Sequence, residues 1–155
     1  MEGAKRRIGV IGAGICPPEI ADIARHVGEL IAGRGGILYC GGLGGVMEAA
    51  ARGASEAGGL TVGILPGSKA SDANSFITVP VVTGMGHARN VILVRSSEAI
   101  IALPGSHGTL SEIAIALKMW KPVVGIGAWG DLPGVHGAKD PEDAVEQAFS
   151  FVNRP

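Results

Sequence analysis

Two glycine-rich segments carry the residue types best suited to binding chemistry. Residues 41–45 (GGLGG) and residues 104–109 (PGSHGT) each run into a stretch with helical spacing. Glycines let main-chain N–H groups turn toward one point at the positive end of a helix dipole, which is how many proteins hold a phosphate. Ser106 and Thr109 add hydroxyl donors in the second segment. Each segment predicts a phosphate-binding loop; the alternative is a tight turn that binds nothing.

One arginine occupies an unusual place in a third segment, residues 83–90 (TGMGHARN). Arg89 falls in the first turn of the helix that we predict there, where the helix dipole disfavours a cation, so stability alone does not explain it. A guanidinium can hold a phosphate through two parallel hydrogen bonds. We therefore expect Arg89 to contact a ligand; the alternative is an ordinary surface arginine.

Glu112 follows Thr109 by three residues, and this spacing has two explanations. Thr-x-x-Glu is a capping box, in which both side chains bond exposed N–H groups at the start of a helix. Judged by spacing alone, this capping role is favoured over a role in chemistry. His107 is expected to be a solvated loop residue, because no carboxylate or nucleophile can be placed beside it from the sequence.

The loop after the first apolar run, residues 12–18 (GAGICPP), excludes a common cofactor. A dinucleotide fingerprint requires a third glycine at position 17 and an acidic residue after the second strand, and neither is present. A P-loop is excluded as well, because no loop ends in Gly-Lys-Ser/Thr. The two prolines suit the first turn of a helix. Neither NAD binding nor triphosphate hydrolysis is predicted.

Four loops supply the predicted ligand-binding residues. The set is Gly12, Gly14, Gly41, Gly42, Gly44, Gly45, Gly84, Met85, Arg89, Asn90, Pro104, Gly105, Ser106, His107, Gly108 and Thr109. No metal site is predicted, because Cys16 and Cys40 lack the spacing of metal ligands.

The elements that must position these loops follow from the apolar pattern. We predict strands over residues 8–11, 37–40, 60–65, 77–82, 99–103 and 122–126, and helices over 19–33, 46–57, 87–96, 109–120 and 142–152. Apolar strands that alternate with helices indicate a parallel sheet buried on both faces. We expect a doubly wound, Rossmann-like α/β fold of six or seven strands, with its ligand beyond the carboxyl ends of the strands where their order reverses.

Length and composition limit the class of protein. The 155 residues predict one domain, residues 1–155, and no apolar run reaches the length of a membrane helix. A net charge of −1, scattered basic residues and 4% aromatics argue against nucleic-acid binding. Two cysteines and no convincing signal peptide predict the cytoplasm. The polar segment 66–75 is expected to be a surface loop, with a lid over the ligand as the alternative.

Taken together, the ordered motifs resemble the Lonely Guy (LOG) superfamily. The resemblance is carried by Gly41-Gly42-x-Gly44-Gly45-x-Met47, then Arg89, then Pro104-Gly105-x-x-Gly108-Thr109-x-x-Glu112, and it extends from the first strand to about residue 126. Members include enzymes that hydrolyse the N-glycosidic bond of nucleoside 5′-monophosphates to a base and ribose 5-phosphate, without a cofactor. The resemblance implies that Glu112 stabilises the developing positive charge or activates water, and that Arg89 helps to hold the substrate.

Two departures from the cytokinin-activating enzymes leave a second function open. Those enzymes typically carry an Arg-Lys pair and a double glycine, whereas this chain has Asn90 after Arg89 and Ser106 in place of the second glycine. The segment from Thr83 to Asn90 more closely resembles a short bacterial branch of the superfamily that is similar to the molybdenum cofactor carrier proteins. The alternative is therefore a carrier that binds a phosphorylated pterin such as molybdenum cofactor and performs no chemistry.

Two further expectations concern cofactor and assembly. The superfamily has carried the label lysine decarboxylase, but a pyridoxal-phosphate enzyme needs a buried lysine, and the lysines here lie in polar segments or near a helix end. We reject that activity. The resemblance also implies a homodimer or higher homo-oligomer, for which the apolar stretch 113–120 (IAIALKMW) is one candidate interface; packing inside a single subunit is the alternative.

Overall fold

Seven parallel strands form one sheet in the order β4-β3-β2-β1-β5-β6-β7. A computed structural model describes residues 3–153, so the outermost two residues at each end of the predicted domain lie outside it. The strands are β1 (Arg7–Ile11), β2 (Ile37–Cys40), β3 (Thr61–Leu65), β4 (Val79–Val82), β5 (Ala99–Ala102), β6 (Val123–Ile126) and β7 (His136–Ala138). The predicted doubly wound, Rossmann-like fold is confirmed.

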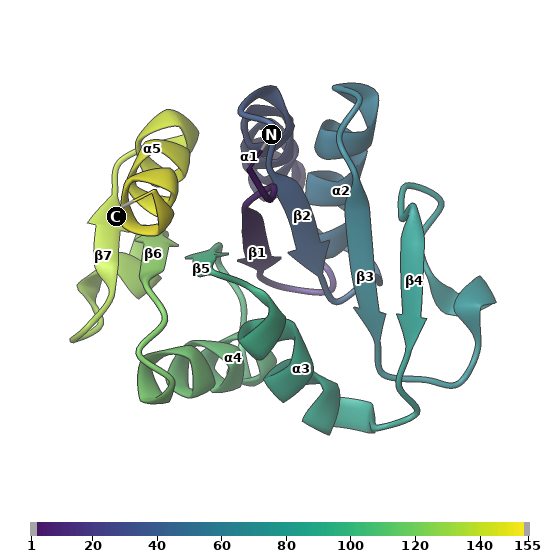
Figure 1. Ribbon diagram of the computed structural model, residues 1–155. Coiled ribbons are helices and arrows are strands. Elements are labelled where there is room, and N and C mark those ends of the chain that lie inside the picture. The colour runs from purple at the N-terminus through teal and green to yellow at the C-terminus, as the bar shows by residue number, and fades with distance from the viewer. Residues whose placement is uncertain (1–2, 154–155) are drawn as a thin grey trace.

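Helices cover both faces of the sheet (Figure 1). They are α1 (Pro18–Gly33), α2 (Val46–Glu56), α3 (Arg89–Ser96), α4 (His107–Lys118) and α5 (Pro141–Val152), with short 3₁₀ turns at η1 (Ala70–Asp72), η2 (Gly86–Ala88) and η3 (Gly127–Asp131). One apolar core lies beneath α1, α2 and α5, and a second lies beneath α3 and α4. None of the described helices is long and apolar enough to cross a membrane.

Several boundaries differ from those predicted. β7 was not predicted, β3 begins at Thr61 rather than Leu60, and β4 begins at Val79 rather than Ile77. α4 begins at His107, two residues before the predicted start at Thr109. The apolar side chain of Leu60 continued the strand pattern in the sequence. In the structure Leu60 is 38% exposed and lies outside β3.

The strand order reverses between β1 and β5, which are neighbours in the sheet although they lie far apart in the sequence. Backbone hydrogen bonds join the loops that follow these strands. The Ala13 N–H donates to the Pro104 carbonyl (3.0 Å), and the Ala13 carbonyl accepts from the Val46 N–H (2.9 Å). Ala13 therefore connects the end of β1 both to the end of β5 and to the first turn of α2.

Helices α1 and α2 pack against each other through glycine. A Cβ atom on Gly28 of α1 would lie 1.9 Å from the Ala50 carbonyl oxygen, and one on Gly53 of α2 would lie 1.8 Å from the Arg25 carbonyl oxygen. Each glycine thus faces the backbone of the other helix. Because backbone atoms cannot turn aside as a flexible side chain can, the distance between the two helices depends on these glycines.

Gly53→Ala is expected to lower the free energy of unfolding by about 3 kcal/mol, because the new methyl group forces the two helices apart. Gly33→Ala is the matched control, since Gly33 ends α1 and a Cβ there has no atom within 4 Å. The control should change stability by less than about 1 kcal/mol. Urea unfolding of both variants measures the difference, and equal midpoints would contradict the packing argument.

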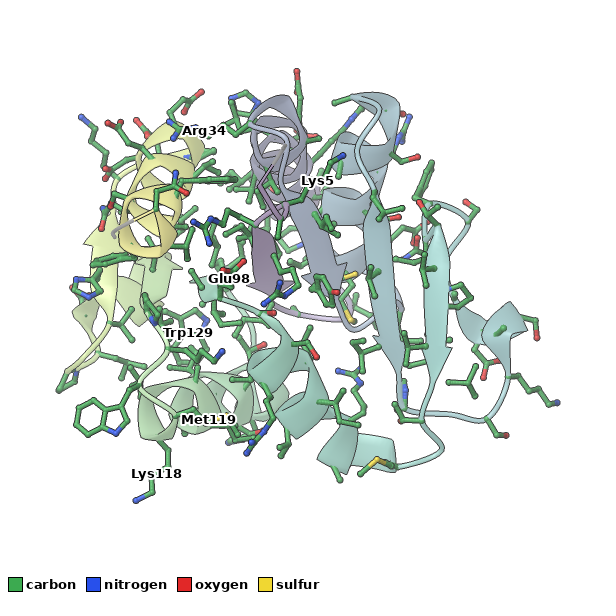
Figure 2. All side chains as sticks on the ribbon, in the orientation of Figure 1. Lys5, Arg34, Glu98, Lys118, Met119 and Trp129 are labelled. Atoms are coloured by element: carbon green, nitrogen blue, oxygen red, sulfur yellow. The ribbon has the colours of Figure 1, made fainter. Side chains whose placement is uncertain are left out.

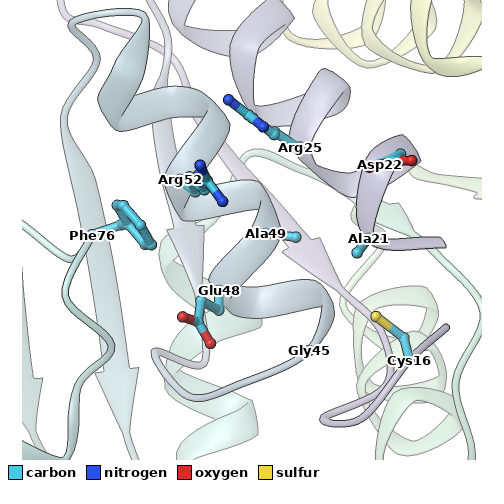
Figure 3. Close-up of a pocket in the computed structure, with 9 residues that line it drawn as sticks. All are labelled: Cys16, Ala21, Asp22, Arg25, Gly45, Glu48, Ala49, Arg52 and Phe76. Carbon is cyan, nitrogen blue, oxygen red and sulfur yellow. The ribbon is translucent and has the colours of Figure 1, made fainter. Parts of the chain in front are cut away.

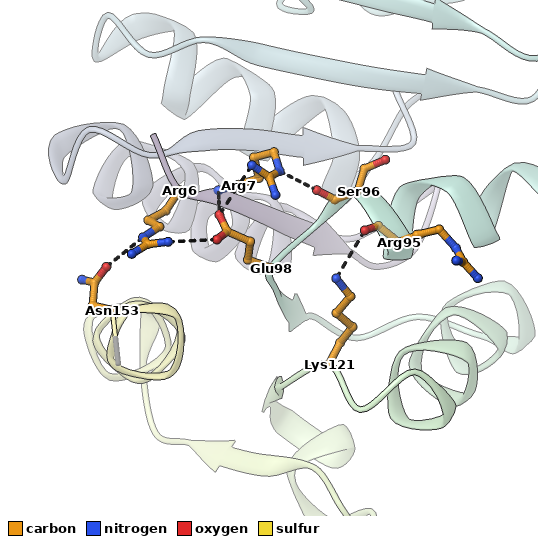
Figure 4. A network of polar contacts seen from close by, with 7 residues as sticks. All are labelled: Arg6, Arg7, Arg95, Ser96, Glu98, Lys121 and Asn153. Atoms are coloured by element: carbon orange, nitrogen blue, oxygen red, sulfur yellow. Dashed lines mark hydrogen bonds and ion pairs between the residues drawn. The ribbon is translucent and has the colours of Figure 1, made fainter. Parts of the chain in front are cut away.

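A polar network ties the amino end of β1 to the α3–β5 connection (Figure 4). The Glu98 carboxylate accepts from the Arg6 Nη1 (3.1 Å) and from the Arg7 backbone N–H (2.8 Å). The Arg6 Nε also donates to Asn153 Oδ1 (3.1 Å), which brings in the end of α5. This network lies beside the amino ends of the strands, on the side away from the carboxyl-end loops.

The segment 66–75, predicted as a surface loop or a lid, is bonded at its carboxyl end to the loop after β2. The Asn74 N–H donates to the Gly42 carbonyl (2.9 Å), and Asn74 Nδ2 donates to the Leu43 carbonyl (2.8 Å). Its other end contacts the connection to α3, because the Pro66 carbonyl accepts from the Gly86 N–H (2.9 Å). The segment therefore supports two of the glycine-rich loops.

Candidate functional site

A polar pocket of about 190 Å³ lies where the strand order reverses. It is bounded by the loop after β1, the first turns of α2, α3 and α4, and η2. Its lining residues are Gly12, Ala13, Gly14, Met47, His87, Arg89, Asn90, Ser106, Gly108, Thr109 and Glu112. This is the edge of the sheet at which the fold class predicts a ligand.

Buried polarity is concentrated in this pocket. Six polar or charged side chains are buried among the described residues, and four of them line the pocket, namely Arg89, Asn90, Thr109 and Glu112. The other two, Thr61 and Ser97, hydrogen-bond backbone carbonyls. Burying polar groups in one place is unfavourable unless they are paired, so the cluster indicates a functional site rather than a folding requirement.

Arg89 and Glu112 form the charged centre of the pocket. Their residues are only 9% and 7% exposed. The Arg89 Nη1 lies 3.9 Å from Glu112 Oε2, which is an ion pair without a direct hydrogen bond, and it donates instead to Asn90 Oδ1 at 2.7 Å. The alternative of an ordinary surface arginine is therefore wrong.

The capping box favoured from the spacing of Thr109 and Glu112 is wrong as well. The residue that precedes α4 is Ser106, so Thr109 lies inside the first turn and Glu112 lies in the second. Both side chains then fall on the buried face of the helix. The carboxylate that spacing assigned to a helix end is instead directed at Arg89.

Burial raises the pKa of Glu112 from its ordinary value of 4.5 to about 7, and the nearby Arg89 charge limits this rise. Arg89 is affected in the opposite direction, because burial lowers its pKa while Glu112 opposes the change. Burial also raises the pKa of the Cys40 thiol to about 11, so this neighbour stays neutral. Glu112 is thus a carboxyl group that exchanges its proton near neutral pH.

This raised pKa predicts how stability depends on pH. A carboxyl group that holds its proton more tightly when folded stabilises the protein below pH 4.5, and that contribution is lost as the pH rises to about 7. At about 1.4 kcal/mol per pKa unit the loss is at most about 3 kcal/mol. Glu112→Gln should therefore gain stability relative to wild type between pH 5 and pH 8. Thermal unfolding of both proteins tests this; a constant difference in melting temperature would contradict it.

Two helices that begin at the pocket, α2 and α4, lack a side-chain cap. Neither Gly45 before α2 nor Ser106 before α4 caps its helix with a side chain. By contrast, α5 begins away from the pocket and is capped by Asp140, whose Oδ1 accepts from the Asp143 N–H at 2.8 Å. Uncapped N–H groups beside a buried arginine form a favourable environment for an anion.

The structure brings seven of the sixteen predicted ligand-binding residues to the pocket. Gly12, Gly14, Arg89, Asn90, Ser106, Gly108 and Thr109 line it, together with Glu112, whereas Gly41, Gly42, Gly44, Gly45, Gly84, Met85, Pro104, Gly105 and His107 do not. Met85 is 49% exposed. Ligand contact by any of these residues stays a prediction.

Three of the six predicted glycines outside the pocket lining instead support it. A Cβ on Gly41 would lie 2.8 Å from both terminal nitrogens of Arg89, and one on Gly105 would lie 2.1 Å from Thr109 Oγ1. Gly45 has a φ of 60°, and its Cβ would lie 2.2 Å from the Ala13 carbonyl oxygen. These glycines let the loops approach closely enough for Arg89 and Thr109 to reach the pocket.

Three lining residues, Ala13, Met47 and His87, were absent from the predicted set. His87 also lines an adjoining, mainly apolar cavity of about 320 Å³ with Leu43, Pro66, Gly86 and Arg89. Arg89 and His87 are thus shared between a polar compartment and an apolar one. The position of His87 two residues before Arg89, after a glycine, was the sequence signal that could have identified it.

Another pocket, of about 280 Å³, lies between α1 and α2 (Figure 3). Arg25 and Arg52 extend into it from the two helices, but both are paired with Glu56. The charged side chains here are exposed, and both arginines already have a carboxylate partner, unlike the buried pair at the end of the sheet. The polar pocket at the strand reversal is therefore the better candidate site.

The lysines agree with the sequence argument against a Schiff-base enzyme. Lys5, Lys69, Lys118 and Lys139 are exposed, and Lys121 donates to the Arg95 carbonyl (3.3 Å). Figure 2 shows Lys118 projecting away from the body of the molecule. None of the five lysines lies in the polar pocket.

The fold and the site define a Rossmann-like protein with a buried polar pocket at the strand reversal. The chain belongs to the SLOG cluster4 family, whose sequence model matches residues 5–151. The resemblance drawn from the glycine motifs is thereby confirmed.

Two curated relatives and two solved structures extend this result. An uncharacterized protein of Archaeoglobus fulgidus is 51% identical over 93% of this chain and 95% of its own length. The cytokinin riboside 5′-monophosphate phosphoribohydrolase of Mycobacterium tuberculosis is 35% identical over 76% of this chain and 67% of its own. The molybdenum cofactor binding protein of Rippkaea orientalis superposes with a TM-score of 0.92 at 39% identity, covering 98% and 100% of the two chains. The molybdenum cofactor carrier protein of Chlamydomonas reinhardtii gives 0.87 at 36%, covering 97% and 100%.

Proposed function

We propose that the protein hydrolyses the N-glycosidic bond of a nucleoside 5′-monophosphate and releases a base and ribose 5-phosphate. The observation that carries this proposal is the buried Arg89–Glu112 pair beside the uncapped first turn of α4. The similarity to the Mycobacterium tuberculosis phosphoribohydrolase supports it. The substrate's phosphate is held by the first turn of α4, at Gly108 and Thr109, and Arg89 helps to orient the substrate.

Glu112 supplies the proton-transfer chemistry in this proposal. Its carboxylate accepts a proton from water while the water oxygen bonds to C1′ of the ribose and the bond from C1′ to the base nitrogen breaks. The base leaves with the bonding electron pair and takes up a proton. A carboxyl pKa of about 7 suits a general base at neutral pH, and a carboxylate also stabilises the positive charge that develops on the sugar ring. No cofactor takes part in these steps.

The apolar compartment beside Arg89 accounts for the remaining part of the substrate. Leu43, Pro66 and Gly86 form its walls, and its volume of about 320 Å³ accommodates a purine-sized ring. Because Arg89 and His87 border both compartments, a ligand in this site spans a polar half and an apolar half. A nucleotide has this division between phosphate and base.

The test is incubation of the purified protein with a panel of nucleoside 5′-monophosphates and chromatographic detection of free base. At least one nucleotide should release base and ribose 5-phosphate in equal amounts, and the matching nucleoside without phosphate should release much less. Failure to release base from every member of the panel would refute the enzymatic proposal.

A second candidate function is transport of a phosphorylated pterin such as molybdenum cofactor. The observation that favours it is the full-length similarity to the Rippkaea orientalis and Chlamydomonas reinhardtii proteins, together with Asn90 and Ser106 in the pocket. A pterin phosphate, like a nucleotide, has a phosphate that suits the polar compartment and a ring that suits the apolar one. This function is tested by titrating the protein with molybdenum cofactor and measuring how far the cofactor quenches the protein's tryptophan fluorescence. Saturable binding without base release would favour the carrier.

Homodimer formation also belongs to the proposal. In the predicted interface, residues 113–120, Ile113 and Ala116 are buried in the core, whereas Trp120 at its end is 92% exposed. Leu110 and Val91 are also exposed on α4 and α3, at 41% and 38%, and we propose this outer helix surface as a second candidate for the dimer contact. Sedimentation equilibrium distinguishes a dimer from the 15.6 kDa monomer.

A further inference from the structure

Arg89 is bound to an amide although a carboxylate lies within reach. Its Nη1 donates to Asn90 Oδ1 at 2.7 Å, while Glu112 Oε2 is 3.9 Å away. A hydrogen bond from a guanidinium to a carboxylate is ordinarily stronger than one to a neutral amide, and the difference grows in a buried pocket. The arrangement therefore requires something that holds the guanidinium away from Glu112.

Asn90 is itself fixed in place by the neighbouring helix. It is only 5% exposed, and its Nδ2 donates to Ser111 Oγ at 3.5 Å. Ser111 belongs to α4 and directly precedes Glu112, and α3 packs against α4 (Figure 1). A chain of contacts thus runs from Ser111 through Asn90 to Arg89, and it ends beside the carboxyl group that follows Ser111.

The rest of the surroundings limits the guanidinium on its other side. A Cβ on Gly41 would lie 2.8 Å from both of its terminal nitrogens, and its Nε is buried without a hydrogen-bond partner in the described structure. Among the described residues, Arg89 from α3 and the Cys40 thiol from β2 interact electrostatically with Glu112, and His87 from η2 lines the same pocket. Cys40 stays neutral, so Arg89 is the charged group whose position matters most to Glu112.

We propose that Asn90 is a positioning residue that holds Arg89 out of hydrogen-bonding distance of Glu112, so that the carboxyl group stays available to a substrate. The contribution of Asn90 to turnover rests on the proposed hydrolase function. Its effect on the geometry does not, because the contacts that define it exist without substrate. Ser111 affects Arg89 indirectly, because it fixes the orientation of the Asn90 amide.

The test is a titration of Glu112 that requires no substrate. Protein labelled with ¹³C at the glutamate carboxyl groups is followed by NMR across the pH range, and the Glu112→Gln variant identifies the Glu112 signal. Asn90→Leu keeps much of the side-chain shape but cannot accept a hydrogen bond, so Arg89 should close on Glu112. The proton affinity of Glu112 should then fall about tenfold, which is one pKa unit. Ser111→Ala should produce a smaller fall in the same direction.

Asn153→Leu is the matched control. Asn153 also accepts a hydrogen bond from an arginine, with its Oδ1 at 3.1 Å from the Arg6 Nε, but at the opposite edge of the sheet. Its removal should leave the Glu112 midpoint unchanged. An unchanged or raised midpoint of the Glu112 titration in Asn90→Leu would overturn the proposal. If the Asn90 variant does not fold, an unchanged midpoint of this titration in Ser111→Ala would overturn it. A shifted midpoint in a protein that releases no base would refute the hydrolase function alone.

Discussion

Glu112→Gln is expected to reduce base release from nucleoside 5′-monophosphates by a factor of about 10²–10⁴, the range typical of a lost general base. Glutamine keeps the volume and the burial of the side chain but cannot accept a proton from water. It also removes the negative charge that, in the proposed reaction, stabilises the sugar ring in the transition state. The affinity for ribose 5-phosphate should change only a few-fold, because in the proposed site the first turn of α4, and not the carboxylate, holds the phosphate.

The pH profile distinguishes loss of the base from a general disturbance of the pocket. Wild-type activity should rise with pH through about 7, where Glu112 loses its proton, and the residual activity of Glu112→Gln should lack this rise. Glu48→Gln is the control, because Glu48 is an exposed carboxylate on α2 outside the polar pocket. Equal base release by wild type and Glu112→Gln would exclude Glu112 as the base.

Gly45→Ala is expected to weaken binding of ribose 5-phosphate at least about 100-fold and to lower the free energy of unfolding by about 4 kcal/mol. Gly45 precedes α2 with φ 60° and ψ −126°, a conformation that side chains rarely adopt. The new Cβ would also lie 2.2 Å from the Ala13 carbonyl oxygen. Since that atom is backbone, the loop after β1 must move, and a displacement of about 1 Å in a site typically costs a factor of about 100.

Calorimetry with ribose 5-phosphate and urea unfolding measure the two effects of Gly45→Ala. Gly44→Ala is the neighbouring comparison, because its φ is not in the left-handed region and its nearest contact, the Gly14 carbonyl oxygen, is 3.1 Å away. That variant should lose much less of both affinity and stability. Wild-type affinity in Gly45→Ala would show that the loop tolerates a side chain and that the pocket does not depend on its position.

Much of the fold could be predicted because the central strands are apolar throughout. β5 is fully buried, and its run of alanine and isoleucine predicted a strand at this position. The missed strand, β7, consists of His136, Gly137 and Ala138 at the edge of the sheet, where the side chains are largely exposed. A strand that buries little has no reason to be apolar, so its sequence pattern is that of a loop.

The candidate site was predictable in its loops but not in its contacts. Glycine content located the turns correctly, yet it could not distinguish a glycine that faces the pocket, such as Gly12, from one that lies against Arg89, such as Gly41. That difference depends on residues that meet only in the folded sheet. Arg89 and Glu112 are likewise far apart in the sequence, so spacing alone favoured a local explanation for Glu112 that the structure contradicts.

The two backbone bonds of Ala13 have a consequence for synthesis of the protein. Its carbonyl accepts from Val46, but the acceptor for its N–H is Pro104, more than ninety positions later in the chain. A nascent chain that has emerged only as far as β4 already contains two of the four glycine-rich loops, and it lacks the partner that fixes the first of them. Domains mature as units on the ribosome, so ligand-binding competence should arise abruptly, only after β5 and α4 have left the exit tunnel.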